Sequence, residues 1–214
     1  MCLDSETLTT DPLIKITFGS GTDLFSSASP ADFNFETTYI QRYQATVEDN
    51  QFAFVNEIYN HYNNAWHTGA TDHTGDAGGY MFLVNANFEP GIFYNRTIGN
   101  LCTDLRYELS VYLANLCQPS GRLDPDVRFQ IRSADGNTVL TELNTGFIPK
   151  TPTLTWNQYG LSFIAPTSTV NLLMISNAPG GNGNDIVIDD IELRVCTLQE
   201  GQTGLCPPPS QPGR

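Results

Sequence analysis

The stretch Asn184 to Val195, NDIVIDDIELRV, decides the fold, because its alternating apolar residues predict a β-strand. Strict alternation puts one carboxylate, Asp189, on the aliphatic face of Val187, Ile191, Leu193 and Val195. A buried ionised carboxylate is costly unless a cation or several hydrogen-bond donors satisfy it. We interpret Asp189 as a metal ligand. The alternative is a buried Asp that accepts backbone N–H bonds near the end of a strand.

Further strand-like segments recur at about ten-residue spacing. They cover residues 13–18, 51–58, 80–86, 91–98, 106–116, 127–134, 138–148, 154–165 and 169–178. The turn ADGN (134–137) suits a hairpin, because an Asp-Gly pair tolerates positive φ. No helical period is present, so the pattern predicts an all-β, antiparallel β-sandwich.

The chain of 214 residues predicts one β-sandwich domain over 13–196. A polar, irregular N-terminal segment, 1–12, is expected before it. A proline-rich tail, 197–214, is expected after it and is typical of a linker in a longer modular protein. No apolar run of 18 residues occurs and no signal peptide is recognisable, so we expect no membrane insertion.

The composition is acidic, with 10 Lys and Arg against 23 Asp and Glu and a formal net charge of −13. Such a surface repels phosphate backbones and anionic lipids, which disfavours nucleic-acid and membrane-surface partners. Neutral ligands or cations fit this charge better.

The five cysteines show no C-x-x-C metal pattern, and disulfides in an exported protein are the expected use. Cys2 and Cys196 flank the first and last strand candidates, and we predict that they pair. A Cys102–Cys196 bridge is an alternative. Cys102 and Cys117 bracket one extended strand and are too far apart to pair unless the loops fold back. Cys206 has Cys196, Cys2 or an external thiol as candidate partners.

Several motifs in order carry a resemblance to known families: DHTGDAGGYM (72–81), GYMFLVNA (79–86), PGIFY (90–94), NAPGGNGND (177–185) and DDI (189–191). The chain resembles MAM domains over roughly residues 13–196. It is closer still to surface modules of Bacteroidetes-type adhesin and gliding-associated proteins, and DDI is also shared by carbohydrate-binding jelly rolls. The resemblance implies a jelly-roll β-sandwich.

The resemblance also implies one structural cation, usually calcium, where the first strand, the DHT loop and the last strand meet. Calcium takes six to eight oxygen ligands without rigid geometry. The implied ligands are Asp189 or Asp190, Asp72 with Thr74 or Gly79, and the backbone around Phe18, including Thr17 and Gly19. An acidic residue that the families carry near this Phe is absent here, which would shift ligands to Asp76, Asp23 or backbone oxygens.

A sugar site needs aromatic faces for the pyranose ring and polar side chains for its hydroxyls. The segment 59–67 supplies both, and we predict contact by Trp66, with Tyr62, His67 and Asn64 beside it. A buried core Trp is the alternative reading of Trp66. The GGNGN loop adds Asn182 and Asn184, although it is also an ordinary turn.

No catalytic motif is present: G-x-S-x-G, H-E-x-x-H and the P-loop are all missing from the sequence. His67 and His73 with Asp72 could form a transition-metal site, but a solvated loop explains these histidines more simply. We therefore expect a non-enzymatic, calcium-stabilised, lectin-like module of a secreted or cell-surface adhesin that binds a glycan or polysaccharide. The first alternative is a structural or protein–protein adhesion module of MAM type, which would contact another surface protein. The second is an enzyme built on a jelly roll, such as a polysaccharide lyase or glycosidase.

Overall fold

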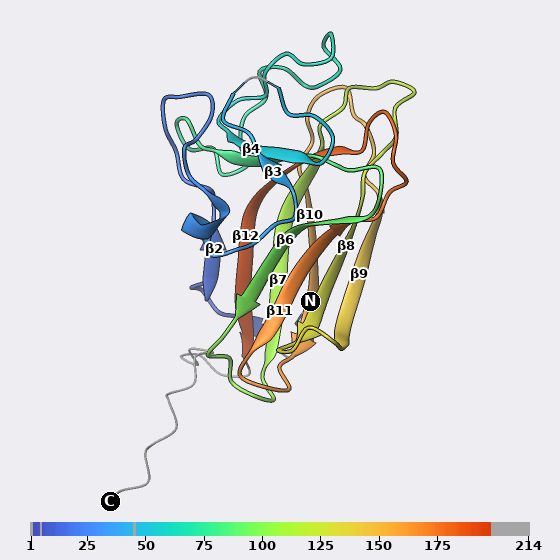
Figure 1. The fold of residues 1–214 in the computed structure, drawn as a ribbon. Coiled ribbons are helices and arrows are strands. Elements are labelled where there is room, and N and C mark those ends of the chain that lie inside the picture. Colours follow the sequence, from blue (N-terminus) through green and yellow to red (C-terminus); the bar gives the residue numbers. More distant parts are fainter. Residues whose placement is uncertain (1, 5, 45, 198–214) are drawn as a thin grey trace, which may run out of the picture.

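The computed structural model describes residues 2–4, 6–44 and 46–197, which form two β-sheets packed face to face (Figure 1). The strands are β1 (Thr7–Leu8), β2 (Ile14–Ile16), β3 (Ile40–Gln41), β4 (Gln51–Val55), β5 (Met81–Asn85), β6 (Gly91–Ile98), β7 (Arg106–Asn115), β8 (Asp126–Ser133), β9 (Val139–Phe147), β10 (Asn157–Ile164), β11 (Val170–Ser176) and β12 (Asp185–Thr197). Within these ranges the only helical element is the short 3-10 turn η1 (Pro30–Phe33). The predicted all-β jelly-roll sandwich is confirmed.

The closing strand β12 is the centre of the larger sheet. It pairs with β7 along one edge and with β5, β2 and β1 in succession along the other. That sheet has eight strands, in the order β10-β7-β12-β5-β4-β3 with β1 and β2 both on β12, and the second sheet has the order β6-β11-β8-β9. Neighbours are antiparallel except β3 and β4, which are parallel. The hairpin predicted at ADGN joins β8 and β9.

The main core lies between the sheets and is rich in aromatic side chains. Phe18 stacks on Phe54 at 5.3 Å between ring centroids, and Phe54 contacts Phe82 at 5.3 Å. A second apolar cluster, around Trp66, lies on the outer face of the large sheet under the β4–β5 loop. Because both faces are covered there, β5 is buried at every position instead of alternating.

A disulfide joins the N-terminal segment to the end of β12. Cys2 and Cys196 are bonded with a Cα–Cα distance of 5.5 Å, which confirms the predicted pair and excludes Cys102–Cys196. Cys102 is also disulfide-bonded, whereas Cys117 is a buried free thiol. The predictions for Cys206 and for the tail beyond Thr197 lie outside the described residues.

The N-terminal segment differs from its prediction as irregular chain, because it contains β1. Thr7 pairs with Thr197, and Leu8 pairs with Cys196. The nearby disulfide holds this short segment against the end of β12. No helix in the part of the chain that is described is long and apolar enough to cross a membrane.

Candidate functional site

A β-bulge at Asp189 and Asp190 changes the face that the closing strand presents. The register with β7 shifts between Asp189 and Glu192, and Asp190 has a φ of 46°. Strict alternation is therefore wrong across this point. The core between the sheets receives Ile186, Ile188, Ile191, Leu193 and Val195, whereas Val187 belongs to the cluster on the outer face. The bulge adds one residue, and the alternation changes phase.

Asp189 is fully buried, with 0% exposure, beneath the loop that carries the DHT motif. Its Oδ2 accepts hydrogen bonds from the His73 amide at 2.9 Å, and from the Thr74 amide and Thr74 Oγ1 at 3.2 Å each. Its Oδ1 accepts from the Asp190 amide at 2.8 Å. Burial raises the pKa of Asp189 to about 6 in spite of these donors. The arrangement matches the alternative weighed for Asp189, a buried carboxylate held by backbone N–H groups.

Asp190 lies beside Asp189 and contacts the same loop. Its Oδ1 accepts from Thr74 Oγ1 at 3.1 Å, and its Oδ2 lies 2.7 Å from His73 Nδ1. The His73 ring stacks on Tyr112 with centroids 3.5 Å apart. The His73 ring thus contacts a carboxylate through Nδ1 and an aromatic ring through one face. His67, by contrast, is buried and its Nε2 has no partner in the structure.

Asp72 is buried where the DHT loop passes the turn after β2. A Cβ atom on Gly79 would lie 2.1 Å from Asp72 Oδ2, so this close approach requires glycine. The Asp76 amide approaches the same oxygen at 3.4 Å, and burial raises the pKa of the Asp72 carboxyl. The structure thus brings Asp72 and Gly79 into contact, as the resemblance implied.

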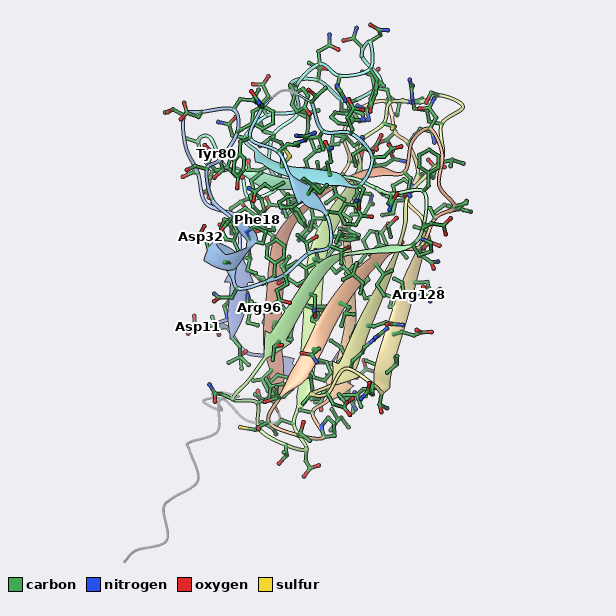
Figure 2. The ribbon with its side chains drawn as sticks, viewed as in Figure 1. Asp11, Phe18, Asp32, Tyr80, Arg96 and Arg128 are labelled. Atoms are coloured by element: carbon green, nitrogen blue, oxygen red, sulfur yellow. A yellow bond between two sulfur atoms is a disulfide. The ribbon has the colours of Figure 1, made fainter. Side chains whose placement is uncertain are left out.

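The turn after β2 is tied to the start of β5. Gly19 O accepts from the Tyr80 amide at 2.8 Å, and Ser20 pairs with Gly79. Phe18 and Tyr80 accordingly lie near each other on the β2 side of the molecule, away from Arg128 on the other side (Figure 2). Ile16 pairs with Ile191, so the next residue, Thr17, lies along the strand at the level of the bulge. First strand, DHT loop and last strand therefore meet in one region, which we call the carboxylate cluster: Asp72, Thr74, Gly79, Asp189 and Asp190.

The donor set of the carboxylate cluster is all oxygen, which suits a hard divalent cation. Among the described residues, only Cys2, Glu108 and Cys196 place three His, Cys, Asp or Glu ligand atoms within 4.8 Å of one another, and the two cysteines form a disulfide. The carboxylates of Asp72, Asp189 and Asp190 are therefore spaced more widely than this. The same criterion excludes a comparably tight His67, His73 and Asp72 group.

Trp66 does not contact solvent, and its predicted role in stacking on a sugar is wrong in this structure. Its side chain is 0% exposed in the second cluster, and Nε1 donates to Asp185 Oδ2 at 2.9 Å. His67 and Asn184 are also buried, and Asn184 Nδ2 donates to Ser176 Oγ. The physical reason is that the β4–β5 loop folds back over the large sheet and buries its own aromatic residues.

Tyr62, Asn64 and Asn182 remain exposed, and the fold brings two of them together. Tyr62 and Asn182 line one cavity of about 240 Å3, here called the loop pocket, whose other lining residues are Asp49, Asn85, Phe88, Gly181, Gly183 and Asp185. The β4–β5, β7–β8 and β11–β12 loops gather at this end of the sandwich (Figure 1). Asn64 does not line the loop pocket.

Two aromatic side chains flank the loop pocket. Tyr62 is 43% exposed and Phe88 is 57% exposed. Tyr62 is held in place by its hydroxyl, which donates to Glu48 Oε2 at 2.7 Å. Gly180 packs so closely on Phe88 that a Cβ atom would lie 2.1 Å from Phe88 Cα. This contact joins the β11–β12 loop to the β5–β6 loop.

The floor of the loop pocket comes from the ends of two paired strands. Asn85, the last residue of β5, pairs with Asp185, the first residue of β12. Asp185 Oδ2 accepts from Trp66 Nε1 and from Cys117 Sγ at 3.3 Å. Burial raises the pKa of Asp185 to about 6. The sequence analysis did not identify Asn85, Asp185 or Phe88 as site residues. The available signal was an aromatic residue, Phe88, in the turn NFEPG.

Comparison with known proteins bears on the fold. No family model and no curated protein sequence matches the chain. Among solved structures, the CBM22-1 xylan-binding domain from Paenibacillus barcinonensis is 13% identical, with 88% of this chain and 97% of that chain covered and a TM-score of 0.50. A cyclase from Fischerella sp. TAU is 15% identical, with 90% and 89% covered and a TM-score of 0.49.

A third structure contains the CBM22-1 and GH10 modules of a Clostridium thermocellum xylanase with xylohexaose; it is 12% identical, with 86% of this chain and 28% of that chain covered and a TM-score of 0.44. Structural neighbours thus include carbohydrate-binding modules as well as enzymes. The fold is that of the jelly-roll β-sandwiches found in carbohydrate-binding modules. The resemblance to MAM domains and to bacterial adhesin modules stays a prediction.

Proposed function

We propose that this domain is a carbohydrate-binding module that holds a sugar in the loop pocket. The observation that carries the proposal is the placement of two exposed aromatic rings, Tyr62 and Phe88, around polar groups at one end of a jelly-roll sandwich. Aromatic faces pack on the C–H side of a pyranose, while amides and carboxylates bind its hydroxyls. The similar fold of the xylan-binding CBM22-1 domain supports this proposal.

Replacing either exposed ring should weaken glycan binding. For Tyr62→Ala and Phe88→Ala we expect at least about a tenfold loss of affinity, or roughly 1.4 kcal/mol, because each change removes a ring that a pyranose would cover. The measurement is a glycan array on the isolated domain, followed by calorimetric titration of the best ligand.

Ile164→Ala is the matched control, because Ile164 is also an exposed large side chain but pairs with Arg106 at the opposite end of β7. Wild-type affinity in both aromatic variants would contradict the loop pocket as the site. A blank array together with concentration-dependent self-association would favour the structural or protein–protein alternative. The exposed Val139 and Phe147 on the edge strand β9 are the feature that supports this alternative.

We further propose that the carboxylate cluster binds calcium and stabilises the domain. Asp72 and Asp190 are the side chains best placed to ligate, with Thr74 Oγ1 and backbone oxygens near Gly79 and Gly19 completing the set. Asp189 would orient the DHT loop through its three hydrogen bonds from His73 and Thr74, or rotate to become a ligand itself. The role of the ion is to draw together and neutralise the carboxylates of the cluster, which contains no Lys or Arg.

Removal of calcium should lower the melting temperature. At a free calcium concentration of about 100 times the dissociation constant, linkage gives roughly 2.7 kcal/mol of stabilisation, which chelation removes. Differential scanning calorimetry with calcium and with chelator measures this. Asp190→Asn should reduce the calcium-dependent shift, whereas Asp11→Asn, an exposed carboxylate elsewhere, should keep it. Identical melts, with no metal in the purified protein, would rule out the ion as a stabiliser.

A secreted or surface-displayed adhesin is the setting we propose. Two cysteines form a disulfide across the ends of the domain, and Cys102 is disulfide-bonded as well. Disulfides persist in oxidising compartments and are rare in the reducing cytosol. The acidic surface also fits a neutral or cationic partner better than an anionic one.

A further inference from the structure

The loop pocket is lined by negative charge and by no positive side chain. Asp49 and Asp185 both face it, and their Coulombic interaction is repulsive. Glu48 lies at the same rim, bonded to the Tyr62 hydroxyl. Arg122 donates from Nε to Asn182 Oδ1 at 3.1 Å and attracts the Asp185 carboxylate, but it is not among the lining residues. An anionic sugar would meet repulsion from Asp49 and Asp185 that this one cation offsets only in part.

A buried amide oxygen at the floor of the pocket lacks a donor. Asn85 is 1% exposed, and its Nδ2 donates to Val47 O at 2.9 Å. Its Oδ1, however, accepts no hydrogen bond within the described structure. A buried acceptor without a partner costs roughly 1–3 kcal/mol. The Asn85 side chain also lies beside the Tyr62 hydroxyl. A ligand N–H or O–H group can therefore reach this covered oxygen only if side chains such as Tyr62 shift.

The size and lining of the loop pocket suit an organic ligand. Two carboxylates, Asp49 and Asp185, line a cavity of about 240 Å3 that is flanked by aromatic rings. This volume lies just under the roughly 300–1,000 Å3 of pockets that enclose drug-sized ligands. It suits one sugar ring, such as a chain end, better than a long stretch of polysaccharide.

We propose that the loop pocket selects a sugar carrying a protonated amine, that is, an unacetylated hexosamine residue. The ammonium group offers three N–H donors and a positive charge to Asp49, Asp185 and the Asn85 oxygen, while the ring lies between Tyr62 and Phe88. N-acetylation removes the charge and two of the donors, and a uronate reverses the charge. This inference rests on the proposed sugar-binding function and deepens it.

The test compares three oligosaccharides by calorimetric titration: a chitosan oligomer with free amines, the N-acetylated chitin oligomer of the same length, and an oligogalacturonate. We expect the amine-bearing oligomer to bind at least about tenfold more tightly than the acetylated one, and the uronate oligomer not to bind. Buffer conditions must keep the amine protonated.

A polycation is attracted to any chain with a net charge of −13, so matched charge variants are needed. Asp49→Asn should remove most of the preference for the amine, whereas Asp11→Asn, an equal change of charge elsewhere, should keep it. Equal binding of chitosan and chitin oligomers, or equal losses in the two variants, would overturn the inference and leave the sugar-binding proposal intact. If none of the three oligomers binds and a glycan array is blank as well, both proposals fail.

Discussion

Trp66→Ala will lower the free energy of unfolding by about 3–5 kcal/mol, because it empties the centre of the second apolar cluster. Trp66 is 0% exposed and lies among Ile58, Leu83 and other buried side chains under the β4–β5 loop. The change also removes the Nε1 donor from the buried carboxylate of Asp185. Urea denaturation followed by circular dichroism measures the loss.

The milder Trp66→Phe separates stability from recognition. It keeps most of the packing but loses the hydrogen bond to Asp185, which should cost about 1 kcal/mol or more because the buried carboxylate keeps only the weaker Cys117 donor. Because Trp66 does not line the loop pocket and acts on it only through Asp185 and Tyr62, the loss of glycan affinity in the folded variant should be smaller than for Tyr62→Ala or Phe88→Ala. Trp156→Phe, at the partly buried edge of the same cluster, is the control and should cost less. Loss of sugar binding in Trp66→Phe with unchanged stability would restore Trp66 as a contact residue.

Removal of the Cys2–Cys196 disulfide is expected to cost about 2–5 kcal/mol, toward the upper end of that range. The bridge closes a loop with a sequence separation of 194 residues, and the entropic benefit of a cross-link grows with loop length. In the double variant Cys2→Ala and Cys196→Ala, β1 retains its short pairing with β12, supported by the Glu6–Arg106 ion pair and the hydrogen bond from Arg194 to Thr9 O. The midpoint of chemical denaturation under oxidising conditions measures the effect.

Wild-type protein treated with reductant is the comparison for this variant. It should lose at least as much stability as the double variant, because the disulfide of Cys102 is reduced as well. An unchanged midpoint in the double variant would mean that the pairing of β1 with β12 and the rest of the sheet already hold the chain ends together.

The bulge at Asp189 shows why the pattern of a strand does not decide which face a residue takes. The sequence alternates, so Asp189 was assigned to the core between the sheets together with Ile191. One extra residue at Asp190 changes the phase, and Asp189 faces the DHT loop instead. The position of the bulge depends on the pairing of β12 with β7 and on the DHT loop that covers Asp189. Neither can be predicted from the sequence of one strand.

The loop pocket illustrates a related limit for the candidate site. Composition pointed to the segment 59–67 as aromatic and polar, and Tyr62 does flank the pocket. Trp66, four residues on, is buried because the loop folds back onto the outer face of the large sheet. Asn85 and Phe88 come from the end of β5 and the loop after it, and Asp185 comes from the start of β12, so only the register of β5 with β12 brings them together.

The sequence by itself determined the all-β sandwich, the position of most strands, the ADGN hairpin and the Cys2–Cys196 pair, because these depend on local periodicity, turn residues and chain ends. It also singled out the motifs of the carboxylate cluster. The tertiary structure alone decided which aromatic residues are exposed, which carboxylates face each other and where an acceptor lacks a donor. These properties depend on how loops distant in sequence pack over the ends of the sheets, and a linear pattern carries no information on that packing.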